Sequence, residues 1–162
     1  MKGDKQIIEH LNIALKKELT AINQYFLHSR ILEDWGITKL AKHEYQESIE
    51  EMQHADLLIK RILFLGGLPN LQDLEKLLIG EDVKEILECD LKLEIGGVEH
   101  YREAIAYCEQ VNDYVTRDLF IQILKEEEGH EDYLETQLQM IEQMGVENYI
   151  QLNSESPLDA EE

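Results

Sequence analysis

The chain has 162 residues, of which 15 are Lys or Arg and 35 are Asp or Glu, so its formal charge is −20. Nucleic acid and anionic membrane surfaces would repel such a chain, so we expect neither as a partner. With 43% hydrophobic residues it should fold, as one domain with a sizeable core. The charge either keeps the surface solvated or attracts cations, such as metal ions or a basic protein.

The first half of the chain predicts two long helices. Only two prolines and nine glycines are present, which favours an all-α protein. Apolar residues at helical spacing predict a first helix over residues 5–34, and Thr38 is expected to cap a second that ends before Gly66. About 16 residues then lead to residue 81, the length of a crossover along a bundle.

The second half repeats this pattern. A third helix is expected over 82–111, a fourth from the turn at 112–113 to 144, and a short fifth over 146–152. Residues 1–152 would then form one domain, a four-helix bundle of two hairpins with a short fifth helix. Residues 153–162 are predicted to be a disordered acidic tail.

The cysteines and the N-terminus bear on the compartment. Cys89 and Cys108 lie 19 residues apart on the predicted third helix, which separates them by roughly 28 Å and prevents their pairing. Free thiols fit a reducing compartment. The first residues show no apolar signal core and no stretch reaches membrane-spanning length, so we expect a cytoplasmic protein.

Two Glu-x-x-His motifs are the candidates for chemistry: Glu51 with His54, and Glu127 with His130. On a helix, residues three apart face nearly the same direction, so each pair can address one point. A single such pair is most often a surface pair. These two copies, however, are separated by the same 76 residues, an offset that also relates Glu18 to Glu94. The chain therefore resembles two diverged copies of one hairpin.

Hairpin geometry brings these residues to one level. The midpoint of Glu18 and Glu51 falls at the first predicted turn, and that of Glu94 and Glu127 falls beside the turn at 112–113. Both Glu18 and Glu94 lie on apolar stripes, where a surface glutamate is not expected. Four buried carboxylates require protons or cations. A pair of metal ions satisfies that demand, and one Glu from each of two helices plus two Glu-x-x-His motifs is the di-iron carboxylate arrangement.

The donor types favour iron or manganese over thiolate-bound zinc. We expect Glu51 and Glu127 to bridge two ions, with Glu18 and His54 completing one position; Glu94 and His130 would complete the other. Tyr25 lies seven residues after Glu18 and hence on nearly the same face. It either supports a site carboxylate, supplies an electron, or is an ordinary core tyrosine.

Beyond these ligands the chain resembles the bacterioferritins over nearly its full length. The resemblance rests on three further stretches, residues 23–28 (NQYFLH), 61–65 (RILFL) and 67–72 (GLPNLQ). It implies a ferritin-like fold, a di-iron ferroxidase that oxidises Fe(II) with O2 or H2O2, and a 24-subunit homo-oligomeric cage that stores the ferric mineral. It also implies an iron–sulfur ferredoxin as the electron donor for iron release.

The resemblance further implies haem b at two-fold subunit interfaces, held by one methionine from each subunit. Met52 matches that ligand. It follows Glu51 directly, so it should point out of the side of the bundle. By residue reasoning alone, an outward methionine is usually a contact residue. The side chains expected to line a haem pocket around it are Leu19, Ile22, Asn23, Phe26 and Tyr45.

Two other functions remain alternatives: a haem-binding structural subunit of a mixed cage, and a rubrerythrin-like di-iron oxidase or peroxidase. One departure from the family concerns the cage interior. Gln46 stands where some bacterioferritins have histidine, which puts an inner-surface iron site in question, although Glu50 keeps a charge there.

Overall fold

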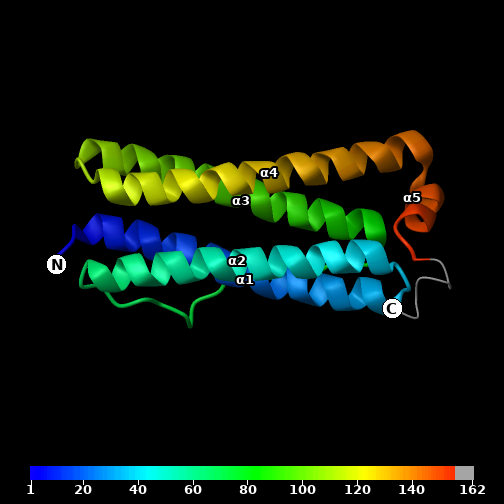
Figure 1. Cartoon of the computed structure of the whole chain (residues 1–162), viewed down its shortest axis with the longest axis horizontal. Coiled ribbons are helices and arrows are strands. Elements are labelled where there is room, and N and C mark those ends of the chain that lie inside the picture. Colours follow the sequence, from blue (N-terminus) through cyan, green and yellow to red (C-terminus); the bar gives the residue numbers. More distant parts are fainter. Residues whose placement is uncertain (156–162) are drawn as a thin grey trace.

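The computed structural model describes residues 1–155 and consists, over that range, of five α-helices without strands. Four long helices form two antiparallel hairpins that lie against each other, and the short fifth helix turns across one end (Figure 1). The helices are α1 (Lys5–Asp34), α2 (Thr38–Phe64), α3 (Val83–Gln110), α4 (Tyr114–Met144) and α5 (Val146–Leu152). This is the ferritin-like architecture that the sequence predicts.

The two hairpins have matching turns. Helices α1 and α3 end at residues 34 and 110, and α2 and α4 begin at 38 and 114, so both boundaries differ by 76. The left-handed residue of each turn obeys the same offset: Gly36 has φ +82° and Asn112 has φ +62°. Asparagine is one of the few side chains that tolerate this conformation. The internal repeat inferred from the sequence thus extends to the backbone.

The prediction that Thr38 caps α2 is wrong. The N-cap position belongs to Ile37, and no side chain caps this helix end. The Thr38 hydroxyl instead accepts a hydrogen bond from the backbone N–H of Glu155, at 3.0 Å. The backbone carbonyl of Asn153 also accepts from Lys39, so the residues just after α5 lie against the start of α2. Residues 156–162, the rest of the predicted tail, lie outside the described residues.

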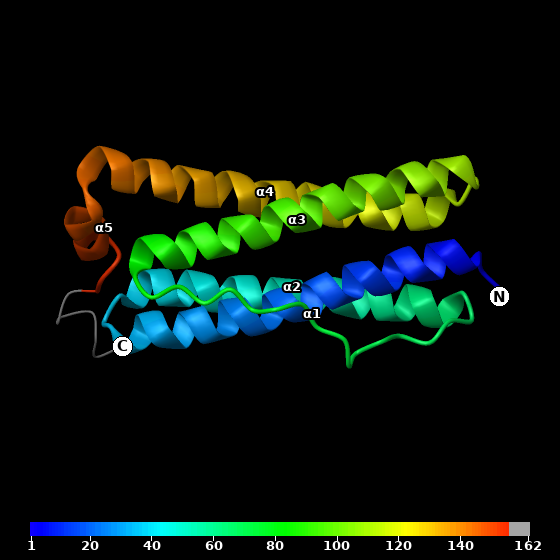
Figure 2. The same cartoon turned by 180° about the vertical axis from the view of Figure 1, so that it is seen from behind.

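Side chains of α1 fasten the crossover to the bundle. They lie four or eight residues apart, so they form a stripe that runs obliquely around the helix. Figure 2 shows the crossover passing along α1 on its way to the start of α3. The backbone N–H groups of Asn70, Glu75, Leu78 and Gly80 donate to the side chains of Asn12, Thr20, Gln24 and His28 in that order, at 2.8–3.0 Å.

The apolar core is split into two clusters, one toward each end of the bundle. Between them, at mid-length, the interior is polar. One cluster includes Leu11, Leu15, Leu58, Ile62, Phe120 and Ile123, and the other includes Leu32, Leu40, Ile86, Leu87, Leu134 and Ile141. None of the described helices is long and apolar enough to cross a membrane. Cys89 and Cys108 are both free, as expected.

Candidate metal centre

Each of the four long helices contributes to the polar zone between the two apolar clusters. The six predicted ligands all lie there, and each is at most 8% exposed. Helix α1 supplies one carboxylate, α3 supplies another, and α2 and α4 each supply a Glu-x-x-His pair. The six are Glu18 (α1), Glu51 and His54 (α2), Glu94 (α3), and Glu127 and His130 (α4).

The six side chains form two overlapping sets of four. Within each set, one potential ligand atom per residue lies within 4.8 Å of all the others. Glu51 and Glu127 belong to both sets, which is the position that bridging carboxylates require. Glu18 and His54 complete one set, and Glu94 and His130 complete the other.

The two imidazoles face the carboxylates through equivalent atoms. Nδ1 of His54 lies 2.9 Å from Oε1 of Glu127, and Nδ1 of His130 lies 3.1 Å from Oε1 of Glu51. Each histidine therefore approaches the glutamate of the opposite hairpin that belongs to both sets. The rings are nearly parallel, with centroids 6.4 Å apart.

Two tyrosines hold the terminal carboxylates. The Tyr25 hydroxyl donates to Oε1 of Glu94, and the Tyr101 hydroxyl donates to Oε1 of Glu18, both at 2.5 Å. Each tyrosine thus reaches across to the helix of the other hairpin. The sequence analysis named Tyr25 but did not assign Tyr101 to the site, although the 76-residue offset pairs these two positions.

The outer nitrogens of the histidines contact a second layer of carboxylates that the sequence analysis did not assign to the centre. Nε2 of His54 is paired with Glu126, and Nε2 of His130 lies 3.0 Å from Glu50. Glu50 and Glu126 are again 76 residues apart. Nε2 of His130 also lies 2.8 Å from Glu47. The counterpart of Glu47 by the same offset is Ile123, so only one half of the centre has this carboxylate.

Crowding of buried carboxylates changes their proton affinity. Burial and the charge of Glu18 raise the pKa of Glu51 to about 8, and burial with the charges of Glu18 and Glu51 raises that of Glu127 to about 7. Burial and Glu127 also raise the pKa of Glu94 well above its ordinary value. Without cations, Glu51, Glu94 and Glu127 therefore bind protons at higher pH than ordinary glutamates do.

The pKa values of the two imidazoles are also raised, although burial acts on them in the opposite direction. Burial by itself would lower the pKa of His54, but contacts with Glu127, Glu18 and Glu51 raise it far above its ordinary value. The pKa of His130 is raised in the same way, against burial, by its carboxylate neighbours. Protons thus balance the negative charge from both sides of the centre.

The donor atoms fit metal ions better than protons alone. Oε2 of Glu18, Oε1 of Glu51 and Nδ1 of His130 are buried without a hydrogen-bond partner among the described residues, and the 3.1 Å contact of the last two lacks hydrogen-bond geometry. Buried polar atoms are seldom left in this state. Cations between the carboxylates would satisfy all three. Four carboxylates with two imidazoles form a donor set suited to iron or manganese.

Met52, the predicted haem ligand, lies outside this centre. Its side chain is 52% exposed on α2, beside the buried Glu51. The exposed rings of Phe26 and Tyr45 lie 6.2 Å apart, and the guanidinium of Arg30 lies 5.1 Å from both ring centroids. The flank of the α1–α2 hairpin therefore carries exposed aromatic and thioether groups.

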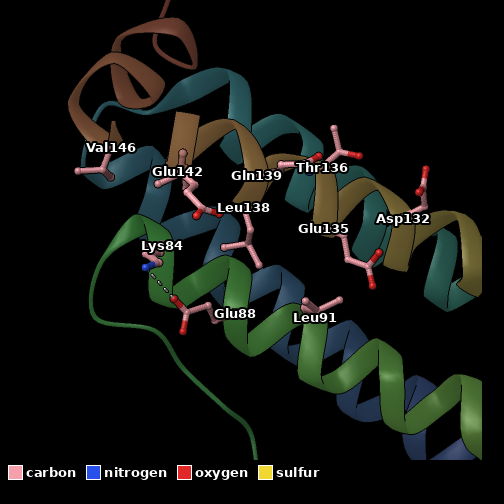
Figure 3. A pocket seen from close by; sticks show the side chains of 11 residues that line it. Lys84, Glu88, Leu91, Asp132, Glu135, Thr136, Leu138, Gln139, Glu142 and Val146 are labelled. Atoms are coloured by element: carbon pink, nitrogen blue, oxygen red, sulfur yellow. Dashed lines mark ion pairs between the residues drawn. The ribbon is translucent and has the colours of Figure 1, made fainter. Parts of the chain in front are cut away.

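A wide groove lies elsewhere on the bundle. It has a volume of about 930 Å³ and runs between the first half of α3 and the second half of α4, reaching Val146 at the start of α5 (Figure 3). Glu88, Asp132, Glu135 and Glu142 are among its lining residues, but none of the six predicted ligands is. The six predicted ligands therefore lie apart from this groove.

Comparison with known proteins agrees with the fold. Residues 8–144 match the family model of the ferritin-like domain. The chain is 53% identical to a bacterioferritin of Brucella melitensis and 52% identical to one of Rhodobacter capsulatus, over all 162 residues and the full length of both relatives. It is 48% identical to a bacterioferritin of Mycolicibacterium paratuberculosis over 149 residues, which are 92% of this chain and 94% of that one.

The four-helix bundle with its carboxylate and imidazole centre thus defines a protein of the ferritin-like class. Within that class, the similarity to bacterioferritins over the whole chain identifies the family. The chain belongs to the bacterioferritin family.

Proposed function

We propose that this chain is an iron-storage subunit whose buried centre is a ferroxidase. The observation that carries the proposal is the pair of overlapping four-residue sets that share Glu51 and Glu127. Two Fe(II) ions bound there would lie side by side, held by opposite ends of the same two carboxylates. Relatives named bacterioferritin over the full chain length support the same role.

The chemistry is a two-electron step on substrate ions. Each Fe(II) gives up one electron to become Fe(III); the two electrons, with two protons, reduce O2 to H2O2 or H2O2 to water. The side chains bind and orient both ions at one level of the bundle. The bridging carboxylates bind Fe(III) more strongly than Fe(II) because they are anionic, which favours the oxidised products.

Tyr25 and Tyr101 have a positioning role in this proposal. Their hydroxyls donate to Glu94 and Glu18, which fixes one oxygen of each terminal carboxylate and leaves the other for an ion. In this proposal Tyr25 would also supply an electron to the centre. Its pKa is raised well above the ordinary value by burial and by Glu94, so its phenol stays protonated until it is oxidised.

We also propose that Met52 binds haem together with Met52 of a second copy. Thioether ligands favour ferrous haem, which suits an electron relay into a cage. The exposed position of Met52 beside Phe26 and Tyr45 supports this role. Replacing Met52 by Leu should abolish the visible haem spectrum of the reconstituted protein. An unchanged spectrum would overturn this assignment.

The ferroxidase proposal is tested by Fe(II) oxidation in the purified protein, followed by absorbance. Glu18→Ala and His130→Ala should each slow the oxidation at least about tenfold because each removes a ligand from one metal position. Equal rates in the wild type and in both variants would exclude the proposed site. The same result would favour the alternative of a structural, haem-binding subunit.

A further inference from the structure

A small hollow of about 10 Å³ lies over the metal centre between α1 and α3. Four carboxylates of the centre form its floor, and Lys17, Ala21, Leu93 and Gly97 form the rest of its lining. A Cβ placed on Gly97 would meet nothing within 4 Å. The hollow therefore connects the buried carboxylates with Lys17 and Leu93, which are partly exposed.

The lining follows the internal repeat throughout. Lys17 pairs with Leu93 at the 76-residue offset, Ala21 pairs with Gly97, and the four carboxylates form two further pairs. The hollow thus lies on the approximate two-fold axis and faces both metal positions alike. At one pair only, Lys17 and Leu93, do the two halves differ in charge.

Lys17 extends over this hollow. Its side chain is 22% exposed, and Nζ lies 3.0 Å from Oε1 of Glu75 on the crossover. A Cβ placed on Gly96 would lie 3.9 Å from the same Nζ, so the ammonium group reaches from α1 to α3. Lys17 is the one cationic residue among those lining the hollow.

The crossover keeps Glu75 at this place. The backbone N–H of Glu75 donates to Thr20, and the next attachments are at Gln24 and His28. These bonds fasten the segment without help from the ion pair. A half-exposed ion pair adds little stability, so fastening the loop does not account for a lysine placed over four carboxylates.

We propose that Lys17 and Glu75 form a charge gate at the outer entrance to the metal centre. This inference rests on the proposed function, because it concerns the route by which divalent ions reach that centre. The ammonium repels an approaching Fe(II) ion, and Glu75 offsets that repulsion. An arriving ion takes Glu75 as a partner in place of Lys17, and then passes to Glu18 or Glu94 below.

The test is the rate of Co²⁺ binding to the intact assembled protein, followed by the visible absorbance of the bound ion. At low salt, Lys17→Gln should bind Co²⁺ about fivefold faster, and Glu75→Gln about fivefold slower, since one charge acts on a divalent ion at short range. Both differences should shrink at high salt. Lys17→Arg, which keeps the charge, should bind as slowly as the wild type.

The neighbouring ion pair between Lys16 and Asp73 provides the matched control. It joins the same two segments at 3.6 Å but does not line the hollow. Lys16→Gln and Asp73→Asn should therefore leave the rate unchanged. Gly97→Leu, which fills the opening, should slow Co²⁺ binding at every salt concentration.

Two outcomes would overturn the gate: equal rates in Lys17→Gln and Lys16→Gln, or normal entry in Gly97→Leu. The final amount of bound Co²⁺ reports separately on the proposed function. A wild type that binds no Co²⁺ at equilibrium would contradict the metal centre itself. Full binding with unchanged rates would contradict the gate alone.

Discussion

Tyr25 and Tyr101 show how far single residues follow the internal repeat. Their hydroxyls make the same bond to the terminal glutamate of the opposite hairpin. A short hydrogen bond to a buried carboxylate both orients it and keeps one of its oxygens occupied. We therefore expect Tyr101 to support the centre in the same way as Tyr25.

We expect Tyr101→Phe to weaken Co²⁺ binding about tenfold, because Glu18 loses the donor that orients it. An equilibrium titration followed by absorbance measures this. Tyr107→Phe is the control. The Tyr107 hydroxyl donates to Asp4 in an exposed hydrogen bond that involves none of the six ligands. Equal affinities in the two variants would show that Tyr101 is only a packing residue.

The metal-free centre makes stability depend on pH. The folded chain keeps protons on Glu51 and Glu127 up to about pH 8 and 7, whereas the unfolded chain has released them by about pH 5. The raised pKa values of His54 and His130 act in the same sense above about pH 6.5. Folding thus binds protons over this range, and stability should fall as pH rises.

The thermal midpoint of the metal-free protein should therefore decrease from pH 5.5 to pH 8.5. Glu51→Gln should reduce this fall and raise the midpoint at pH 8 by at least about 2 °C, because one buried charge is removed. Glu9→Gln, at an exposed position, should behave as the wild type does. A midpoint that rises with pH would contradict the proposed protonation of the centre.

At this scale the sequence predicts the ligands better than their partners. Each Glu-x-x-His motif is recognised by the spacing of its two residues, and the common 76-residue offset identifies Glu18 and Glu94 as further ligands. The second-layer carboxylate Glu47 follows neither rule, because its counterpart is Ile123. Its position beside His130 depends on the packing of α2 against α4, which no pattern within one helix encodes.

Among the elements, the crossover is the one whose path the sequence predicts least well. Its length was predictable, but its course along α1 was not. That course depends on backbone donors of the crossover meeting side chains of α1 that are more than 50 residues away in the sequence. Helix boundaries were easier to predict because glycines and capping acids mark them in the sequence. The exception is Thr38, which bonds to Glu155 and caps nothing.

His28 is the most buried attachment of the crossover. Its Nε2 accepts from Gly80, so its Nδ1 carries the proton and donates to Asp90 at 2.8 Å. His28→Ala should destabilise the protein by about 2–3 kcal/mol, because Asp90 loses a donor in a fully buried place. Asn12→Ala, at the exposed end of the crossover, should cost less than about 1.5 kcal/mol.

Denaturant unfolding measures both variants, and hydrogen exchange gives the local effect. The amides of Leu78 and Gly80 should exchange faster in His28→Ala than in Asn12→Ala. Equal protection of these amides in the two variants would contradict the proposed role of His28 in holding the crossover.

On the scale of the whole molecule, a single chain leaves too much apolar surface uncovered. Leu63, Phe64 and Leu68 at the end of α2 are 58%, 55% and 83% exposed, and Met52 is exposed on the same helix. Apolar groups gathered in this way usually meet another protein surface. A homo-oligomeric cage built from further copies of the chain would cover them.

We expect the purified protein to elute at about 450 kDa, which is 24 times the 18.9 kDa of one chain. Size-exclusion chromatography with analytical ultracentrifugation checks this, and Leu63→Glu should reduce the assembled fraction. Elution as a dimer or tetramer would favour the rubrerythrin-like alternative.

The 76-residue offset also divides the molecule into two half-proteins. Residues 1–66 carry Glu18, Glu51 and His54, which are three of the six ligands, and the second hairpin carries their equivalents. Two copies of one such hairpin, packed with exact symmetry, would present a full ligand set with two identical metal positions. Joining the halves into one chain allows those positions to diverge. Glu47 and Lys17 lack equivalents in the second half, so the surroundings of the two positions differ in the fused chain, whereas those of a symmetric pair would be identical.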